Sequence, residues 1–198
     1  MIKKLLYLLL GIIALILIVA AFLPSSYTVE RSVEIAKPPE VVYPLVADYN
    51  NWLKWSPWPK MDPEAKQTVT GTPGAPGHSW SWEGETSGVG SMTLASAEEN
   101  RSVQAKLVFK KPMESEADDS ILLEPTPTGT KVTWRNSGNL PYPIGRFFGL
   151  GIEGMLGPQF EEGLAGVKSI AESIEEPPPP ATTPMTEETP TASPSSTS

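Results

Sequence analysis

The chain has 198 residues, of which 39% are hydrophobic, and its formal net charge is -8 from 15 Lys and Arg against 23 Asp and Glu. This acidic balance, without a cluster of basic residues, argues against nucleic acid as a partner, because phosphate binding needs a concentrated basic surface. The absence of cysteine excludes disulfides, a thiolate nucleophile and a cysteine-based zinc site.

The first predicted element is a membrane-spanning helix within residues 1–24. Residues 5–23 carry no charge, and as a helix they span roughly 28 Å, close to the hydrocarbon thickness of a bilayer. By the positive-inside rule, Lys3 and Lys4 hold the N-terminus in the cytoplasm. We therefore expect a single-pass membrane protein whose domain is extracytoplasmic, either periplasmic or extracellular.

The alternative for this segment is a signal peptide that is cleaved after the small residues Val19, Ala20 and Ala21. The apolar run is longer than the roughly 7–15 residues usual for a signal peptide, which favours a retained helix. Both interpretations export the domain.

A strand and a short helix open the predicted soluble domain, residues 25–175. Polar and apolar residues alternate over 27–35, which is typical of a half-buried strand. Pro39 suits the first turn of a helix, and apolar residues at helical spacing continue over 41–46.

A series of antiparallel strands is predicted over residues 67–137, because turn signals recur between segments of alternating polarity. The clearest strands are 103–109, 117–123 and 132–134. An exposed loop with three tryptophans is expected before them: Trp52, Trp55 and Trp58.

A long helix and a tail complete the chain. Apolar residues between Phe148 and Ile174 fall on one helical stripe. Pro158 favours a kink, and the many glycines of this helix permit close approach to a sheet. Residues 176–198, rich in Pro, Thr and Ser, are predicted to be disordered.

This order of elements resembles the helix-grip fold of the SRPBCC superfamily, which includes START-like lipid-transfer domains and polyketide cyclase/dehydrase-like proteins. The N-terminal helix resembles the layout of membrane-anchored bacterial members. The resemblance covers roughly residues 24–174. It implies an α+β fold in which a curved antiparallel sheet of about seven strands surrounds the long C-terminal helix and encloses an apolar cavity. The strings that carry it are residues 29–35, 38–43, 48–52, 55–58, 79–84, 88–92 and 129–134.

Two polar residues are weak candidates for chemistry, although no catalytic constellation is evident. Arg31 and Asp119 lie on the otherwise apolar face of their predicted strands. Each should therefore form an ion pair, line the cavity or be turned outward by a bulge. Inside a cavity, Asp119 could act as an acid or a base. His78, the only histidine, is interpreted as a surface residue.

The expected ligand-binding residues are aromatic or apolar and should face the cavity, with plain core packing as the alternative for each. Trp80 and Trp82 share one strand face, and Trp134 lies on another buried phase. No metal and no cofactor is expected. The full set is Tyr43, Trp80, Trp82, Trp134, Phe147 and Met155.

Three functions remain open. The first is a membrane-tethered module that binds a small hydrophobic or lipid-like ligand in the cavity. The second is a cyclase- or dehydratase-type enzyme that uses the same cavity, and the balance leans against an enzyme. The third is an envelope protein-interaction domain with a filled core, whose tail or tryptophan loop contacts a partner that the sequence does not identify.

Overall fold

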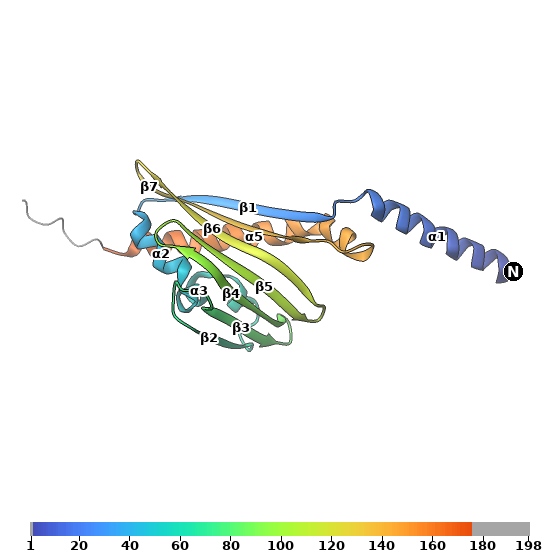
Figure 1. Cartoon of the computed structure of the whole chain (residues 1–198), viewed down its shortest axis with the longest axis horizontal. Coiled ribbons are helices and arrows are strands. Elements are labelled where there is room, and N and C mark those ends of the chain that lie inside the picture. Colours follow the sequence, from blue (N-terminus) through green and yellow to red (C-terminus); the bar gives the residue numbers. More distant parts are fainter. Residues whose placement is uncertain (1, 176–198) are drawn as a thin grey trace, which may run out of the picture.

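The computed structural model describes residues 2–175. Helix α1 (Ile2–Phe22) extends away from an α+β domain (Figure 1). It is long and apolar enough to cross a membrane, a test that signal sequences near an N-terminus also pass. Nearly all of its side chains are exposed, with Ala20 as the buried exception. The predicted disordered tail, 176–198, lies outside the described residues.

The domain is built on a curved sheet of seven strands in the order β1-β7-β6-β5-β4-β3-β2. Every neighbouring pair is antiparallel. This confirms the predicted helix-grip sheet, in which β1 closes against the last strand. The strands are β1 (Ser26–Ile35), β2 (Lys66–Thr70), β3 (Ser79–Gly84), β4 (Gly88–Glu98), β5 (Ser102–Lys111), β6 (Ser115–Thr126) and β7 (Gly129–Asn139).

The strand register defines two ends of the sheet. Ser26, the first residue of β1, pairs with Asn139, the last residue of β7. Because successive strands are antiparallel, the β3–β4 and β5–β6 turns lie at this same end. Helix α1 stops at Phe22, just before β1 begins, so we call this the α1 end of the domain (Figure 1).

Helix α5 (Ile144–Ser173) lies across the concave face of the sheet. Its second half buries Phe160, Leu164 and Val167, as the predicted stripe requires. The close approach depends on Gly163, where a Cβ would lie 2.7 Å from the Trp134 ring. Pro158 lies inside the helix without ending it.

The prediction of an exposed tryptophan loop is wrong. Trp52 and Trp55 are buried, and their indole nitrogens donate to the backbone oxygens of Val46 (2.7 Å) and Leu45 (2.9 Å). The cause is local: Asp48 caps a new helix by accepting from the backbone nitrogen of Asn50, which folds both indoles back onto the core. The helices in this region are α2 (Pro39–Ala47), α3 (Tyr49–Trp55) and α4 (Trp58–Met61).

The interpretation of His78 as a surface residue is also wrong. Its ring is fully buried and stacks on Tyr49 with the ring centroids 4.8 Å apart. Its Nε2 accepts from the backbone nitrogen of Tyr49 at 2.9 Å, so Nδ1 carries the proton and donates to the Thr70 oxygen at 2.9 Å. The histidine therefore ties the segment between β2 and β3 to α3 as part of the core.

Candidate ligand-binding pocket

The sheet and α5 enclose a cavity of about 420 Å³. This volume is within the range of roughly 300–1,000 Å³ that small-molecule sites occupy. Its walls are mostly apolar because inward-facing residues alternate along each strand and α5 contributes further apolar side chains. The aromatic residues that line it are Tyr27, Trp52, Trp58, Trp80, Trp82, Phe109, Trp134 and Phe160.

Local sequence fixes one aromatic wall. Trp80 and Trp82 occur two residues apart on β3, so both point inward, with ring centroids 5.1 Å apart. Gly90 pairs with Trp82 on β4, and a Cβ there would collide with the indole. Phe109 packs against Trp82 edge to face, with the ring centroids 5.5 Å apart. A glycine and an alternating strand thus hold a large indole at the pocket wall.

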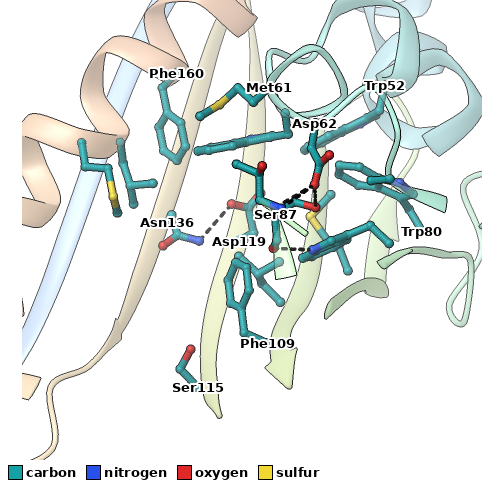
Figure 2. Close-up of a pocket in the computed structure, with 18 of the residues that line it drawn as sticks. Trp52, Met61, Asp62, Trp80, Ser87, Phe109, Ser115, Asp119, Asn136 and Phe160 are labelled. Atoms are coloured by element: carbon teal, nitrogen blue, oxygen red, sulfur yellow. Dashed lines mark hydrogen bonds between the residues drawn. The ribbon is translucent and has the colours of Figure 1, made fainter. Parts of the chain in front are cut away.

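A polar cluster lies deep in this apolar pocket. Asp119 on β6 is 6% exposed and pairs in register with Asn136 on β7. The Trp134 indole donates to both carboxylate oxygens, at 2.9 and 3.1 Å. Asn136 donates to Oδ2 at 3.1 Å and accepts from the Tyr27 hydroxyl at 2.8 Å. Figure 2 shows Asp119 and Asn136 side by side and joined by this hydrogen bond.

Burial controls the charge of Asp119. Removal from water raises the pKa of its carboxyl group to about 7, although the hydrogen bonds from Asn136 and Trp134 act in the opposite direction. Near neutral pH the group therefore changes between a charged acceptor and a neutral donor. The partners described above are all donors, so a proton on Asp119 is available to whatever occupies the pocket.

The mouth of the pocket is at the α1 end of the domain. Among the lining residues, Met61, Thr86, Ser115 and Met155 are exposed. They belong to the end of α4, the β3–β4 turn, the start of β6 and the first half of α5. Asp62 braces this rim by accepting from the backbone and hydroxyl of Ser87, both at 2.8 Å. These bonds lower the pKa of Asp62, the backbone bond most strongly.

The structure brings four of the six predicted ligand-binding residues to the cavity: Trp80, Trp82, Trp134 and Met155. Tyr43 and Phe147 do not line it. The Tyr43 hydroxyl lies beside Gly74, at the opposite end of the domain, and Phe147 is half-buried in the first turn of α5.

Sequence reasoning missed several lining residues. Tyr27 and Asn136 were not considered, although Asn136 continues the inward phase of Val132 and Trp134 and that signal could have found it. Trp52 and Phe160 also line the pocket. No group of three or more His, Asp or Glu side chains within residues 2–175 is arranged to hold a metal ion.

Arg31 does not line the pocket. Arg31 lies on the inward face of β1, and β1 has no bulge there that would turn the side chain outward. Its guanidinium reaches α5. There it pairs with Glu153 and Glu161, each at 2.7 Å. Gly157 leaves space for it, because a Cβ at that position would collide with the guanidinium. Of the two catalytic candidates, only Asp119 therefore faces the cavity.

Comparison with known families gives one clear match. The family model described as "Polyketide cyclase / dehydrase and lipid transport" matches residues 26–172. No curated protein is a significant sequence match to this chain.

Solved structures share the fold at low sequence identity. The protein MLL2253 from Mesorhizobium loti is 22% identical, with a TM-score of 0.54 over 73% of this chain and 98% of its own. CV1439 from Chromobacterium violaceum is 16% identical, with a TM-score of 0.55 over 73% and 96% of the two chains. The di-domain ARO/CYC protein StfQ from the steffimycin biosynthetic pathway is 13% identical, with a TM-score of 0.55 over 75% of this chain and 51% of its own.

Proposed function

The chain belongs to the polyketide cyclase/dehydrase and lipid transport family, and from that membership we propose that its pocket binds a small hydrophobic or lipid-like molecule. The observation that carries the proposal is the aromatic cavity of about 420 Å³ with a buried carboxyl group in its depth. Broad apolar walls with a few convergent polar groups are characteristic of small-molecule sites.

The polar groups narrow the chemistry of the ligand. Trp80 Nε1, a donor, and Gln67 Oε1, an acceptor, are buried without a hydrogen-bond partner among residues 2–175, and both residues line the pocket. Buried polar atoms normally have partners, because leaving one unpaired costs about 1–3 kcal/mol. A ligand that is largely apolar and carries a hydroxyl or carbonyl group could satisfy these atoms and Asp119.

We also propose that α1 is retained and spans the membrane, with the N-terminus in the cytoplasm and the domain outside it. Its length and composition support this, as do Lys3 and Lys4 before the apolar run. The domain itself contacts the helix: Arg146 Nη1 donates to the backbone oxygens of Ala20, Ala21 and Leu23 at 3.1 to 3.2 Å.

An enzyme of the cyclase or dehydratase type is the second candidate. It is favoured by Asp119, whose pKa of about 7 suits a group that gains and loses a proton at neutral pH. Arg31 has no part in it, because its guanidinium pairs with α5 outside the cavity. An interaction domain with a filled core is disfavoured by the open pocket and by the burial of Trp52 and Trp55.

The test is mass spectrometry of small molecules retained by the full chain purified in mild detergent, before and after incubation with a bacterial lipid extract. Leu107→Trp fills the pocket, and Leu122→Trp makes the same change at an exposed position of β6. We expect a reproducible bound species that Leu107→Trp reduces at least about tenfold and Leu122→Trp leaves unchanged, because the affinity of a filled pocket falls by more than about 1.4 kcal/mol. No retained or captured species in the unmodified chain would contradict the binding function.

A further inference from the structure

The first half of α5 exposes apolar residues on the side that is polar in its second half. At helical spacing, Ile144, Phe148 and Met155 form one stripe, and the stripe continues with exposed Glu162 and Ser169. Large exposed apolar side chains that gather in one place usually mark an interaction surface. We define the α5 apolar surface as Tyr142, Ile144, Phe148 and Met155, which are 50% to 66% exposed.

This surface lies beside the last turns of α1. The Tyr142 hydroxyl donates to the backbone oxygen of Leu17 at 3.0 Å. Leu17 precedes the end of α1 at Phe22 by five residues, or about 8 Å along a helix. Arg146 holds the C-terminal carbonyls of α1, as a cation near a helix C-terminus often does. If α1 spans a bilayer, these contacts position the surface at the boundary between lipid and water.

The pocket mouth is part of the same region. Met155 belongs both to the α5 apolar surface and to the pocket lining. Of the other exposed lining residues, Thr86 and Ser115 lie at the α1 end of the sheet, and Met61 precedes Asp62, which accepts from Ser87 in the β3–β4 turn. Figure 1 shows the start of α5 and the β5–β6 turn on the side from which α1 extends. The opening is therefore directed toward the region where the membrane surface would be.

We propose that the α5 apolar surface inserts into the interface of the same bilayer that α1 spans, so that the pocket opens onto lipid. The inference rests on the proposed membrane anchorage and defines the route by which a ligand enters. Tyr142 and Phe148 are typical of membrane interfaces, where aromatic and apolar side chains enter the boundary region. Arg146 lies beside them, at the depth where a guanidinium reaches phosphate groups.

The α5 apolar surface could instead contact a second copy of the chain. The bilayer is favoured because of the position of the surface relative to α1. The contacts of Tyr142 and Arg146 fix the surface relative to α1 within one chain. Any lipid that surrounds the last turns of α1 therefore meets the surface without a further binding event.

Single-cysteine labelling tests the proposal, because the chain has no native cysteine. The full chain is reconstituted into vesicles of phosphatidylcholine and phosphatidylglycerol and labelled with an environment-sensitive fluorophore at Phe148→Cys. Leu122→Cys, exposed on β6 away from the α1 end, is the matched control. We expect spin-labelled lipid to quench the Phe148 label at least about threefold more than the control label, and aqueous iodide to quench it less.

Each other outcome overturns the proposal. Equal quenching at both positions would mean that the surface faces water, and protection from iodide without quenching by lipid would indicate a protein contact instead. Release of the chain from vesicles by alkaline washing would remove the membrane anchorage on which the inference rests. None of these readouts uses a ligand, so they stay informative even if the pocket binds nothing.

A second variant tests the functional consequence. Ile144→Asn combined with Phe148→Asn makes the surface polar without changing a residue that lines the pocket. We expect capture of ligand from donor vesicles to slow by about tenfold, whereas binding from detergent solution stays the same. Equal rates from vesicles would overturn the proposed entry route, and loss of binding in detergent by the unmodified chain would contradict the proposed function instead.

Discussion

In the second half of α5, Phe160, Leu164 and Val167 are at most 2% exposed, whereas in the first half Ile144 and Phe148 are 66% and 57% exposed. One continuous helix thus has a half that fills the core and a half that borders an open cavity. The difference indicates that stability is concentrated at the far end of the domain, and that the α1 end leaves apolar surface exposed. The variants below test this division.

The largest expected effect is at Phe160, whose ring stacks on Trp134 with the centroids 4.1 Å apart. Phe160→Ala should lower the free energy of unfolding by about 3–5 kcal/mol, because it removes the buried ring that stacks on Trp134 and enlarges the cavity beside it. Phe148→Ala, the same change in the first half, should cost less than about 0.5 kcal/mol. Chemical denaturation measures both, and equal losses would contradict the division.

Asp119 provides the next largest effect. Its folded pKa of about 7 lies above the 3.8 that is ordinary for an aspartate, so between these two pH values the folded state holds a proton that the unfolded chain releases. The contribution of this group to the free energy of unfolding is therefore complete below about pH 4 and is lost as the pH rises to 7, by up to roughly 4 kcal/mol.

Asp119→Asn should remove this component, so that the variant gains stability relative to the unmodified chain between pH 5 and pH 8. Asp118→Asn, at the exposed neighbouring position, serves as the control and should leave the pH dependence in place. Denaturant titrations at the two pH values decide the matter. If the free energy of unfolding changed with pH in the same way for Asp119→Asn as for the unmodified chain, the carboxyl group would already be ionised in the folded state.

Two glycines of α5 should respond in opposite directions. A Cβ at Gly163 would press on Trp134 and Trp55, at 2.7 and 3.3 Å, whereas at Gly154 it meets nothing within 4 Å. Gly163→Ala should destabilise the domain by about 1–3 kcal/mol through overpacking. Gly154→Ala should stabilise it by up to about 1 kcal/mol through helix propensity. Thermal unfolding of the two variants should shift the midpoint down and up, respectively.

The smallest effect is expected at Arg31. Its side chain is 29% exposed, and its partners Glu153 and Glu161 are exposed further. Arg31→Met should change the free energy of unfolding by less than about 1 kcal/mol, because partly hydrated ion pairs contribute little. A loss well above that value at moderate salt would indicate that the pairs hold the first half of α5 on the sheet.

Strand alternation and helical spacing predicted most of the fold. The alternation over residues 27–35 located β1 to within one residue of its start, and the apolar stripe located α5. The same signals failed for His78, because its burial depends on the backbone nitrogen of Tyr49, a donor 29 positions away in the chain. Periodicity carries no information about such a partner.

The candidate site was predictable only in part for a related reason. The sequence placed Asp119 on the inward face of its strand. Whether the side chain faces the pocket or is turned outward by a bulge depended on the pairing of Asp119 with Asn136 between β6 and β7. Tyr43 and Phe147 were expected at the cavity because helix and sheet face each other along their length. The cavity occupies only part of that interface, since Leu164, Val167 and their neighbours fill the rest.

The connection between α1 and β1 consists of residues 23–25, and three extended residues reach only about 10 Å. A long flexible tether would let a domain sweep a large volume and meet partners at an effective concentration set by its length. This domain instead keeps one orientation relative to α1, which Arg146 reinforces. With α1 in a bilayer, the domain moves by lateral diffusion in two dimensions. Any partner must then travel to the pocket.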